Sequence, residues 1–397
     1  MQLIEPRLKT ALELFHGGRL AESAALARAL AADPQQPDGP GLDALLGELD
    51  LLANRPAAAA EHLAAALAET PRSRRLLGIY ETAERRAGRP SAAAALYREL
   101  GRAALAAKIQ ALADTGGGNA HLREPAAPVY WLGESRIPVV AATLDTAAGP
   151  RAARFVIDTG VDETLLDPDL AEAAGAKTFG SEGIHFPAGP ASQVQHALLP
   201  ALTLGPLRLE QLPVQLHETR ATLAGLVSVP IDGIIGGNVL ARCPVALDYG
   251  GRQLRFGSMA PASAGVPFYL AADGYPLLPA QVNERATTLL FLDTGMTGTG
   301  VALPLSTARQ ANVDLLAGVE GVGFGVRNSL PAQPICCSSL AAGGVERRML
   351  PGMLLPEFRL ERRFGFRIGG LLGDGFIGEG CLHLDYGRMR LAIVDPA

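Results

Sequence analysis

The chain has few cysteines and few aromatic residues. Only four of its 397 residues are cysteine, and aromatic residues make up 5%. No CxxC pair occurs, and the adjacent Cys336 and Cys337 are poorly placed for a disulfide framework. We therefore expect that thiols do not organise this fold.

Positive charge is not in excess either. Lysine and arginine total 35 against 40 aspartates and glutamates, which gives a formal net charge of −5. Phosphate contacts need a basic surface, so a general nucleic-acid-binding protein is excluded. Apolar residues make up 48%, which is typical of a globular chain and not of a disordered one.

Long apolar runs are also missing. No stretch reaches the roughly 18 uncharged apolar residues of a membrane-spanning helix, and the first residues carry charges where a signal peptide has an apolar segment. We expect no membrane span and, on the visible sequence, a cytoplasmic location, or a periplasmic or secreted one if a signal peptide was removed. The seven histidines show no ligand spacing such as HExxH, which predicts no metal site.

The first hundred residues are rich in alanine and contain a repeat. Three segments align, with starts at Gly18, Asn54 and Gly88 that lie 36 and 34 residues apart. Such spacing is typical of helix-turn-helix repeats of about 34 residues, in which a Gly or Asn turn starts the second helix. The segment resembles tetratricopeptide repeats, although most aromatic positions of that motif are Ala or Leu here; a non-repetitive helical bundle is the alternative. We expect an all-α domain over residues 1–115 and a Gly- and Pro-rich linker over 116–128.

The rest of the chain has the pattern of an all-β region, and this pattern occurs twice. Short β-branched and apolar runs alternate with Gly and Pro turns. Four motifs of the first half recur in order 135 to 138 residues later, and this duplication predicts two homologous β lobes, over residues 129–258 and 265–397. The pairs are Ile137-Pro138 with Tyr275-Pro276, Asp158-Thr159-Gly160 with Asp293-Thr294-Gly295, Ile234-Ile235-Gly236 with Leu371-Leu372-Gly373, and Leu247-Asp248-Tyr249-Gly250 with Leu384-Asp385-Tyr386-Gly387.

Each lobe combines two motifs. The Asp-Thr-Gly sequences that begin at Asp158 and Asp293 directly follow apolar strands, and two aliphatic residues precede a glycine further on, at Gly236 and Gly373. This combination resembles the aspartic peptidase family, in its bacterial-type retropepsin or pepsin-like form with two lobes in one chain. The resemblance covers about two thirds of the chain. It implies an all-β bilobal acid-protease fold with pseudo-two-fold symmetry behind the helical domain.

The resemblance also implies roles for single residues. Asp158 and Asp293 would form the catalytic dyad. The residues implied to support the dyad are Thr159, Gly160, Thr294 and Gly295, and those of the second motif implied to hold the catalytic turns are Ile235, Gly236, Leu372 and Gly373. A third Asp-Thr-Gly, at residues 114–116, follows a helical segment and has no second motif, so we interpret it as a helix end.

Paired carboxyl groups suit this chemistry. Two carboxylates that face each other cannot both ionise, so one proton is shared, as is established for aspartic proteases. One carboxylate then accepts a proton from water while the other group donates a proton to the substrate carbonyl oxygen. The expected mechanism requires no covalent intermediate, metal or cofactor.

The chain departs from the family in its substrate-binding parts. Pepsin-like enzymes carry a tyrosine on the flap that covers the substrate, but no tyrosine occurs between residues 177 and 195. We predict a retropepsin-like flap at residues 179–192, with a counterpart at 321–328 in the second lobe. The flap residues expected to touch substrate are Gly183, Ile184, His185 and Phe186.

A second departure follows the second motif of each lobe. Retropepsins place an arginine after its glycine, and this chain has Gly237 and Asp374 there. The ion pair usually formed at this position is therefore in doubt.

The sequence predicts an aspartic endopeptidase that hydrolyses peptide bonds with a water activated between Asp158 and Asp293. The helical repeats would recruit a protein substrate, and dimerisation is not needed because one chain supplies both lobes. Two alternatives stay open. One is a non-catalytic protease-like scaffold or peptide-binding protein, and the other is a latent enzyme whose repeats cover the cleft.

Overall fold

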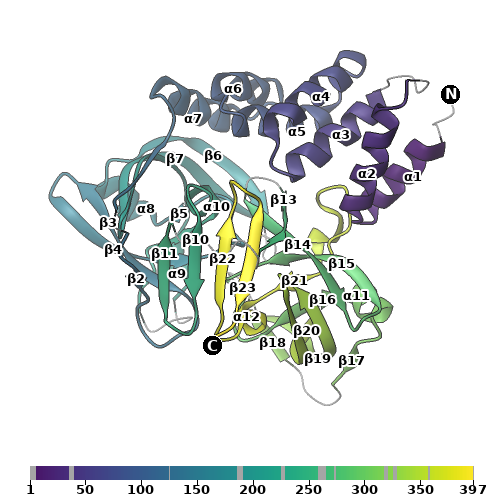
Figure 1. Ribbon diagram of the computed structural model, residues 1–397. Coiled ribbons are helices and arrows are strands. Elements are labelled where there is room, and N and C mark those ends of the chain that lie inside the picture. Colours follow the sequence, from purple (N-terminus) through teal and green to yellow (C-terminus); the bar gives the residue numbers. More distant parts are fainter. Residues whose placement is uncertain are drawn as a thin grey trace.

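The structure is a computed structural model that describes residues 6–34, 40–124, 126–185, 191–224, 229–257, 265–271, 274–316, 321–324, 329–355 and 358–396. An N-terminal helical region precedes an all-β body with two barrels (Figure 1). In the described ranges, no helix has the length and apolar character needed to cross a membrane.

The helical region, called the helical block below, consists of successive antiparallel helices. Its elements are α1 (Pro6–His16), α2 (Leu20–Ala31), α3 (Pro40–Leu52), α4 (Pro56–Glu69), α5 (Arg74–Arg86), α6 (Pro90–Glu99) and α7 (Ala103–Asp114). Helices α2, α4 and α6 begin just after the three repeat starts expected from the sequence. The third Asp-Thr-Gly lies at the end of α7, in agreement with its interpretation as a helix end.

The turns between helices share one geometry. Gly18, Asn54 and Gly88 have positive φ angles of 79°, 54° and 77°. In each turn the next amide reaches the carbonyl oxygen five residues back, as in the bond from the Arg19 N–H to Leu14 O of 2.9 Å. This pattern closes a helix with a left-handed residue, a conformation that glycine and asparagine adopt at low cost. Gly101, with a φ of 80°, repeats the turn before α7.

The first lobe is a six-stranded barrel. Its strands follow the order β3-β4-β9-β5-β8-β7, and β7 pairs with β3 to close the ring; β1 and β6 extend the sheet. The elements are β1 (Asn119–Leu122), β3 (Val139–Thr146), β4 (Gly149–Ile157), β5 (Leu165–Leu166), β6 (Lys177–His185), β7 (Ala191–Leu204), β8 (Leu207–Leu216) and β9 (Gly233–Ile235), with short helices α8 (Pro168–Ala173), α9 (Thr219–Thr222) and α10 (Gly237–Leu240).

The second lobe repeats the same strand order, as β14-β15-β21-β16-β20-β19, closed by the pairing of β14 with β19. The duplication in the sequence is therefore a duplication of one barrel. The elements are β13 (Tyr269–Ala271), β14 (Tyr275–Val282), β15 (Ala286–Leu292), β16 (Val301–Pro304), β17 (Asp314–Leu315), β18 (Gly321–Phe324), β19 (Ser329–Ala342), β20 (Val345–Leu355) and β21 (Leu371–Leu372), with α11 (Leu305–Gln310), a 3₁₀ helix (Arg359–Arg362) and α12 (Asp374–Ile377).

A six-stranded sheet joins the lobes. Its order is β12-β23-β22-β10-β11-β2, so β10 of the first lobe pairs with β22 of the second. The pairing is antiparallel, with Val245 opposite Leu384 and Asp248 opposite Cys381. The elements are β2 (Val129–Tyr130), β10 (Val245–Asp248), β11 (Gln253–Phe256), β12 (Val266–Pro267), β22 (Cys381–Asp385) and β23 (Arg390–Val394).

The segment expected as a linker contains a strand. Asn119–Leu122 forms β1, which pairs antiparallel with β8. The connection between the helical block and the first lobe is thus partly built into the first sheet. A Gly- and Pro-rich composition predicted a loop here, and the pairing with a neighbouring strand edge overrides that local preference.

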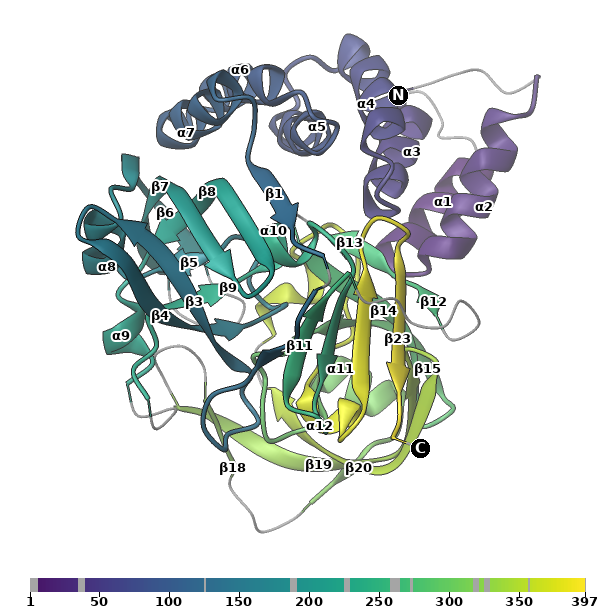
Figure 2. The ribbon, with the colours of Figure 1, turned by 60° about the vertical axis from the view of Figure 1, so that its left-hand side comes forward.

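The helical block packs on the body at both of its ends (Figure 2). Helices α1 to α3 share an apolar cluster with the second lobe, in which the Phe15 and Phe366 rings meet edge to face at 5.5 Å. Strand residues Leu277 and Phe291 belong to the same cluster. At the other end, α7 contacts β6, β7 and β8 of the first lobe. The helices therefore bridge the two barrels.

Candidate active site

The two aspartates lie at equivalent places in the two barrels. Asp158 follows β4 and Asp293 follows β15. Each strand pairs in parallel with the strand of the second motif, β4 with β9 and β15 with β21. The pairing continues one residue further, because the Asp158 N–H donates to Ile235 O at 3.0 Å and the Asp293 N–H donates to Leu372 O at 2.9 Å. The aliphatic residues of the second motif thus fix the backbone of each aspartate.

The glycines of the second motif lie against the turns that follow the aspartates. A side chain at Gly236 would place its Cβ 2.6 Å from Val161 O, and one at Gly373 would come equally close to Met296 O. Both distances are shorter than any real contact of a Cβ atom, so only glycine fits without displacing the turn. The Gly237 N–H then bonds Val161 O at 2.8 Å.

The two threonines join the lobes below the aspartates. Each hydroxyl donates to a main-chain carbonyl of the other lobe, Thr159 to Leu292 O at 2.7 Å and Thr294 to Ile157 O at 3.2 Å. Each hydroxyl also accepts from the main-chain N–H of the other threonine, at 3.0 and 3.1 Å. Both residues are fully buried. Four buried hydrogen bonds therefore hold the aspartates in one relative position.

The two carboxyl groups face each other and share hydrogen bonds. The Gly295 N–H donates to Asp158 Oδ1 at 3.2 Å and to Asp293 Oδ1 at 3.0 Å, and the Gly160 N–H donates to Asp158 Oδ1 at 2.6 Å. Met296 adds a further N–H to Asp293 Oδ1 at 3.1 Å. A Cβ atom at Gly160 would come within 2.6 Å of Asp293 Oδ1, so the absence of a side chain lets the carboxyl groups approach.

Burial and mutual repulsion shift the protonation of this pair. The pKa of Asp293 lies well above its usual range because of burial, the charge of Asp158 and a hydrogen bond between the two carboxyl groups. Burial also raises the pKa of Asp158, although the N–H groups of Gly160 and Gly295 oppose that rise. Over the whole residue, both aspartates are half-buried. The arrangement stabilises a state with one shared proton.

A comparison with protein families matches these two motifs of the first lobe. The model of a family described as aspartyl protease matches residues 140–239, a range that holds both Asp158 and Gly236. This segment is thus similar to an aspartyl protease domain. The second barrel, with the same strand order and a second aspartate, fits the other lobe of such a protease. No curated protein matches the chain.

In one lobe an ion pair does form directly after the second motif. Here an aspartate stands where retropepsins have an arginine, and its partner is the arginine. Asp374 Oδ2 accepts from Arg136 Nε at 2.8 Å, and Asp374 Oδ1 accepts from the Gly298 N–H at 2.9 Å. Arg136 precedes β3 in the first protease lobe, so the pair crosses between the lobes. At the pseudo-symmetric position Gly237 packs directly on Gly274, where an added Cβ would come within 2.7 Å. No ion pair can form there because neither residue has a side chain.

The predicted flap corresponds to the hairpin of β6 and β7. Gly183 pairs with Gln193 in that hairpin, and the backbone of Ile184 and His185 lies in β6. Phe186 lies outside the described residues, as do 325–328 of the second-lobe counterpart, whose residues 321–324 form β18. The flap therefore stays a prediction.

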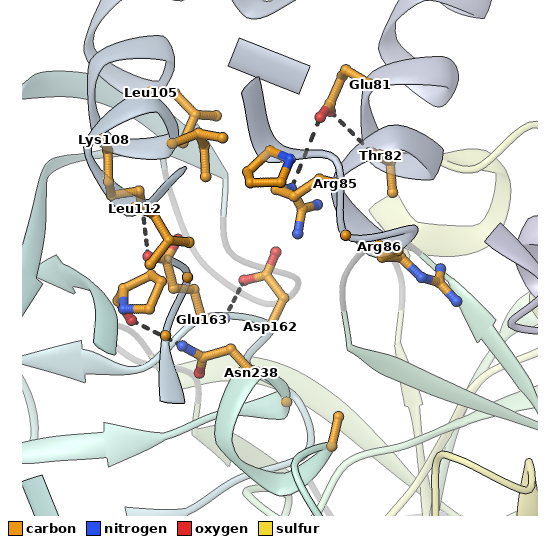
Figure 3. Close-up of a pocket in the computed structure, with 18 of the residues that line it drawn as sticks. Glu81, Thr82, Arg85, Arg86, Leu105, Lys108, Leu112, Asp162, Glu163 and Asn238 are labelled. Atoms are coloured by element: carbon orange, nitrogen blue, oxygen red, sulfur yellow. Dashed lines mark hydrogen bonds and ion pairs between the residues drawn. The ribbon is translucent and has the colours of Figure 1, made fainter. Parts of the chain in front are cut away.

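A pocket lies beside the dyad, between the protease lobes and the helical block, and has a volume of about 1250 Å³. Its floor includes the turn from Gly160 to Glu163 and Asn238 of α10, and its roof is formed by α5, α6 and α7. Figure 3 shows Arg85 of α5 and Asp162 of the turn after Asp158 pointing toward each other across this space. The sequence left open a helical domain that covers the cleft, but no motif in it indicated which helices lie beside the site.

A buried polar network fixes α7 to the first lobe. The Lys108 side chain is 1% exposed and donates to Glu163 Oε1 at 2.5 Å and to His196 Nδ1 at 3.1 Å. His196 Nε2 bonds Glu182 Oε2 at 3.1 Å, and Glu182 also accepts from Arg102 Nε at 2.7 Å. Burial and the charge of Lys108 lower the pKa of His196. The neutral imidazole that results accepts from Lys108 and donates to Glu182.

The described ranges contain no group of three or more His, Cys, Asp or Glu side chains suited to a metal ion.

Proposed function

We propose that this protein is an aspartic peptidase that hydrolyses peptide bonds with a water activated between Asp158 and Asp293. The observation that carries the proposal is the pair of enclosed carboxyl groups, one from each barrel, with raised pKa values and shared N–H donors. These features are those that general acid–base catalysis by two carboxyl groups requires.

The proposed reaction uses only these two groups and water. The ionised carboxylate accepts a proton from water as the water oxygen bonds to the peptide carbonyl carbon. The protonated carboxyl group donates its proton to the carbonyl oxygen. The carboxyl group that took a proton from water then donates it to the nitrogen as the C–N bond breaks. A hydroxyl of the tetrahedral carbon returns a proton to the other carboxylate, and a new carboxyl group and a new amine leave the site.

We further propose that the helical block acts as a repeat domain of the tetratricopeptide type that helps to bind a protein substrate. Stacked helical repeats present extended binding surfaces, and α5 and α7 line the pocket beside the dyad. The block cannot be deleted as a test, because α1 to α3 share an apolar cluster with the second lobe. Point substitutions on the pocket side of the helices are the appropriate perturbation.

The proposed activity is tested with an unfolded protein mixture at pH 3 to 7 in water enriched in ¹⁸O. Wild type should release peptides whose new carboxyl groups carry the label, and Asp293→Asn should release none. Asp145→Asn is the matched control, since Asp145 lies on the surface in an ion pair with Arg208 and should leave turnover intact. Equal release by wild type and Asp293→Asn, or no release by wild type at any pH, would overturn the proposal.

A further inference from the structure

The pocket beside the dyad continues the path that a substrate takes past the catalytic turn. Gly160 packs against both catalytic carboxyl groups and also lines the pocket, as do Val161 and Asp162 further along the turn. A peptide that lies over the dyad and follows this turn therefore enters the pocket. The volume of about 1250 Å³ exceeds that of an ordinary small-molecule site, so it accommodates several residues of a chain.

The helical block covers this end of the substrate path and is held in place. Arg102, just before α7, pairs with Glu182 of the first lobe, and Lys108 of α7 pairs with Glu163. On the far side, helices α1 to α3 share their apolar cluster with the second lobe. The pseudo-symmetric end, at α12, lies away from the helices in both ribbon views (Figures 1 and 2). The helical block thus roofs one end of the path and lies away from the other.

Positive charge predominates in the pocket wall. Seven cationic side chains line it against three carboxylates, although the whole chain carries a net charge of −5. Two further carboxylates, Glu84 and Glu182, do not line the pocket but pair with arginines of its wall. When these two are included, seven cations still face five carboxylates. The cations are Arg85, Arg86, Arg89, Arg102, Lys108, Arg242 and Arg363, and the carboxylates of the lining are Glu81, Asp162 and Glu163.

One of these cations has no acidic partner. Arg242 Nε donates to Asn238 O at 3.0 Å and Arg242 Nη1 donates to Gly118 O at 3.2 Å. Within the described part of the chain these two carbonyls are its hydrogen-bond partners, and it forms no ion pair with a carboxylate. A guanidinium that has several N–H donors in a fixed planar arrangement matches a carboxylate well. Arg242 is accordingly the residue in the wall best suited to an incoming anion.

We propose that this pocket binds the C-terminal carboxylate of a peptide substrate, and that the protein releases short peptides from the C-terminal ends of its substrates. The inference rests on the proposed peptidase function and adds its substrate class. The helices that cover the pocket obstruct a chain that continues beyond it, whereas a chain that ends in the pocket fits. An N-terminal ammonium group would instead meet an excess of like charge.

The specificity is tested with dodecapeptides made in two forms, with a free C-terminal carboxylate and with a C-terminal amide. Wild type should cut the free acids within a few residues of the C-terminus, and amidation should lower kcat/KM at least ten-fold. Arg242→Met should reduce that ratio toward one. Arg208→Met, a surface arginine that is ion-paired with Asp145, should keep the ratio. Internal cleavage of acids and amides at equal rates would overturn the inference while leaving the peptidase function standing.

Binding separates the two proposals if no turnover is found. Asp293→Asn, with the dyad inactivated, is titrated with the same peptides carrying an N-terminal fluorophore, and anisotropy gives Kd. The free acid should bind at least ten-fold more tightly than the amide, and Arg242→Met in the same background should remove the difference. Equal Kd values for acid and amide overturn the pocket assignment. An amidated peptide ending in aspartate that binds as tightly as the free acid would overturn the C-terminal assignment and attribute recognition to a side-chain carboxylate.

Discussion

Removal of the Thr294 hydroxyl tests most directly how the two lobes are held together. Thr294→Val keeps the shape of the side chain and removes the hydroxyl, so it creates no cavity. Two of the four hydrogen bonds between the threonines and the opposite lobe are lost, namely the bond to Ile157 O at 3.2 Å and the bond from the Thr159 N–H at 3.0 Å. Both lie in fully buried surroundings.

The expected cost follows from these two bonds. A buried donor that loses its partner costs about 1–3 kcal/mol, and an ordinary buried hydrogen bond contributes about 1 kcal/mol. The Thr159 N–H becomes such a donor, and the bond to Ile157 is an ordinary one. We therefore expect Thr294→Val to lower the free energy of unfolding by about 2–4 kcal/mol.

The measurement is urea unfolding followed by the fluorescence of Trp131, the only tryptophan in the chain. Trp131 packs edge to face on Tyr249 at 5.0 Å, near the sheet that joins the lobes, so it reports on their separation. Thr294→Ser keeps the hydroxyl and should retain most of the stability. Thr299→Val is the matched control, since its buried hydroxyl makes only one long bond of 3.5 Å to Val301 O. A loss for Thr294→Val no larger than that of Thr299→Val would refute the reasoning.

Three further predictions concern protonation and packing. Because the pKa of Asp293 is raised, the stability that its protonated form contributes is present below the ordinary carboxyl pKa and is lost as pH rises through the raised value. Asp293→Asn should therefore stabilise the fold more at pH 7 than at pH 4. Thermal unfolding at both pH values checks this. The pKa of His196 is lowered, so the stability that the neutral imidazole contributes is complete above about pH 6.5, the ordinary histidine pKa. That stability is lost as pH falls through the lowered pKa. His196→Gln should accordingly show a smaller loss of stability between pH 7 and pH 5 than wild type, and an identical pH profile would contradict the arrangement with Lys108. Gly236→Ala should lower the free energy of unfolding by about 1–3 kcal/mol in a denaturant titration, because its Cβ would meet the backbone oxygen of Val161; a neutral effect would show that the turn yields.

The fold class and the two aspartates of the candidate site could be predicted from the sequence because local rules and symmetry determine them. An Asp-Thr-Gly after an apolar strand specifies the strand and a tight turn. Two aliphatic residues and a glycine further along the chain specify a second strand whose glycine packs closely on that turn. The same motifs at one offset indicated two copies of one barrel. The helix starts after Gly18 and Gly88 were equally local, since a left-handed turn residue both ends one helix and sets the start of the next.

Other features depend on partners that are far apart in the sequence. Arg136 and Asp374 are 238 residues apart, and nothing near either residue predicts that they pair across the lobes. Lys108 has the sequence context of an exposed lysine on an alanine-rich helix, yet it is buried because Glu163 and His196 meet it there. The flanking residues of β1 favoured a loop, and the edge of β8 made a strand of it.

The sequence by itself therefore determined the barrel type, the two catalytic candidates and the glycines beside them, because steric and hydrogen-bonding demands act over a few residues. Only the tertiary structure decided where the helical block lies. Its docking depends on the sum of apolar contacts around Phe15 and ion pairs around Lys108, which no local pattern encodes. That docking places α5 and α7 over the pocket that Arg242, the residue proposed to bind the substrate carboxylate, also lines.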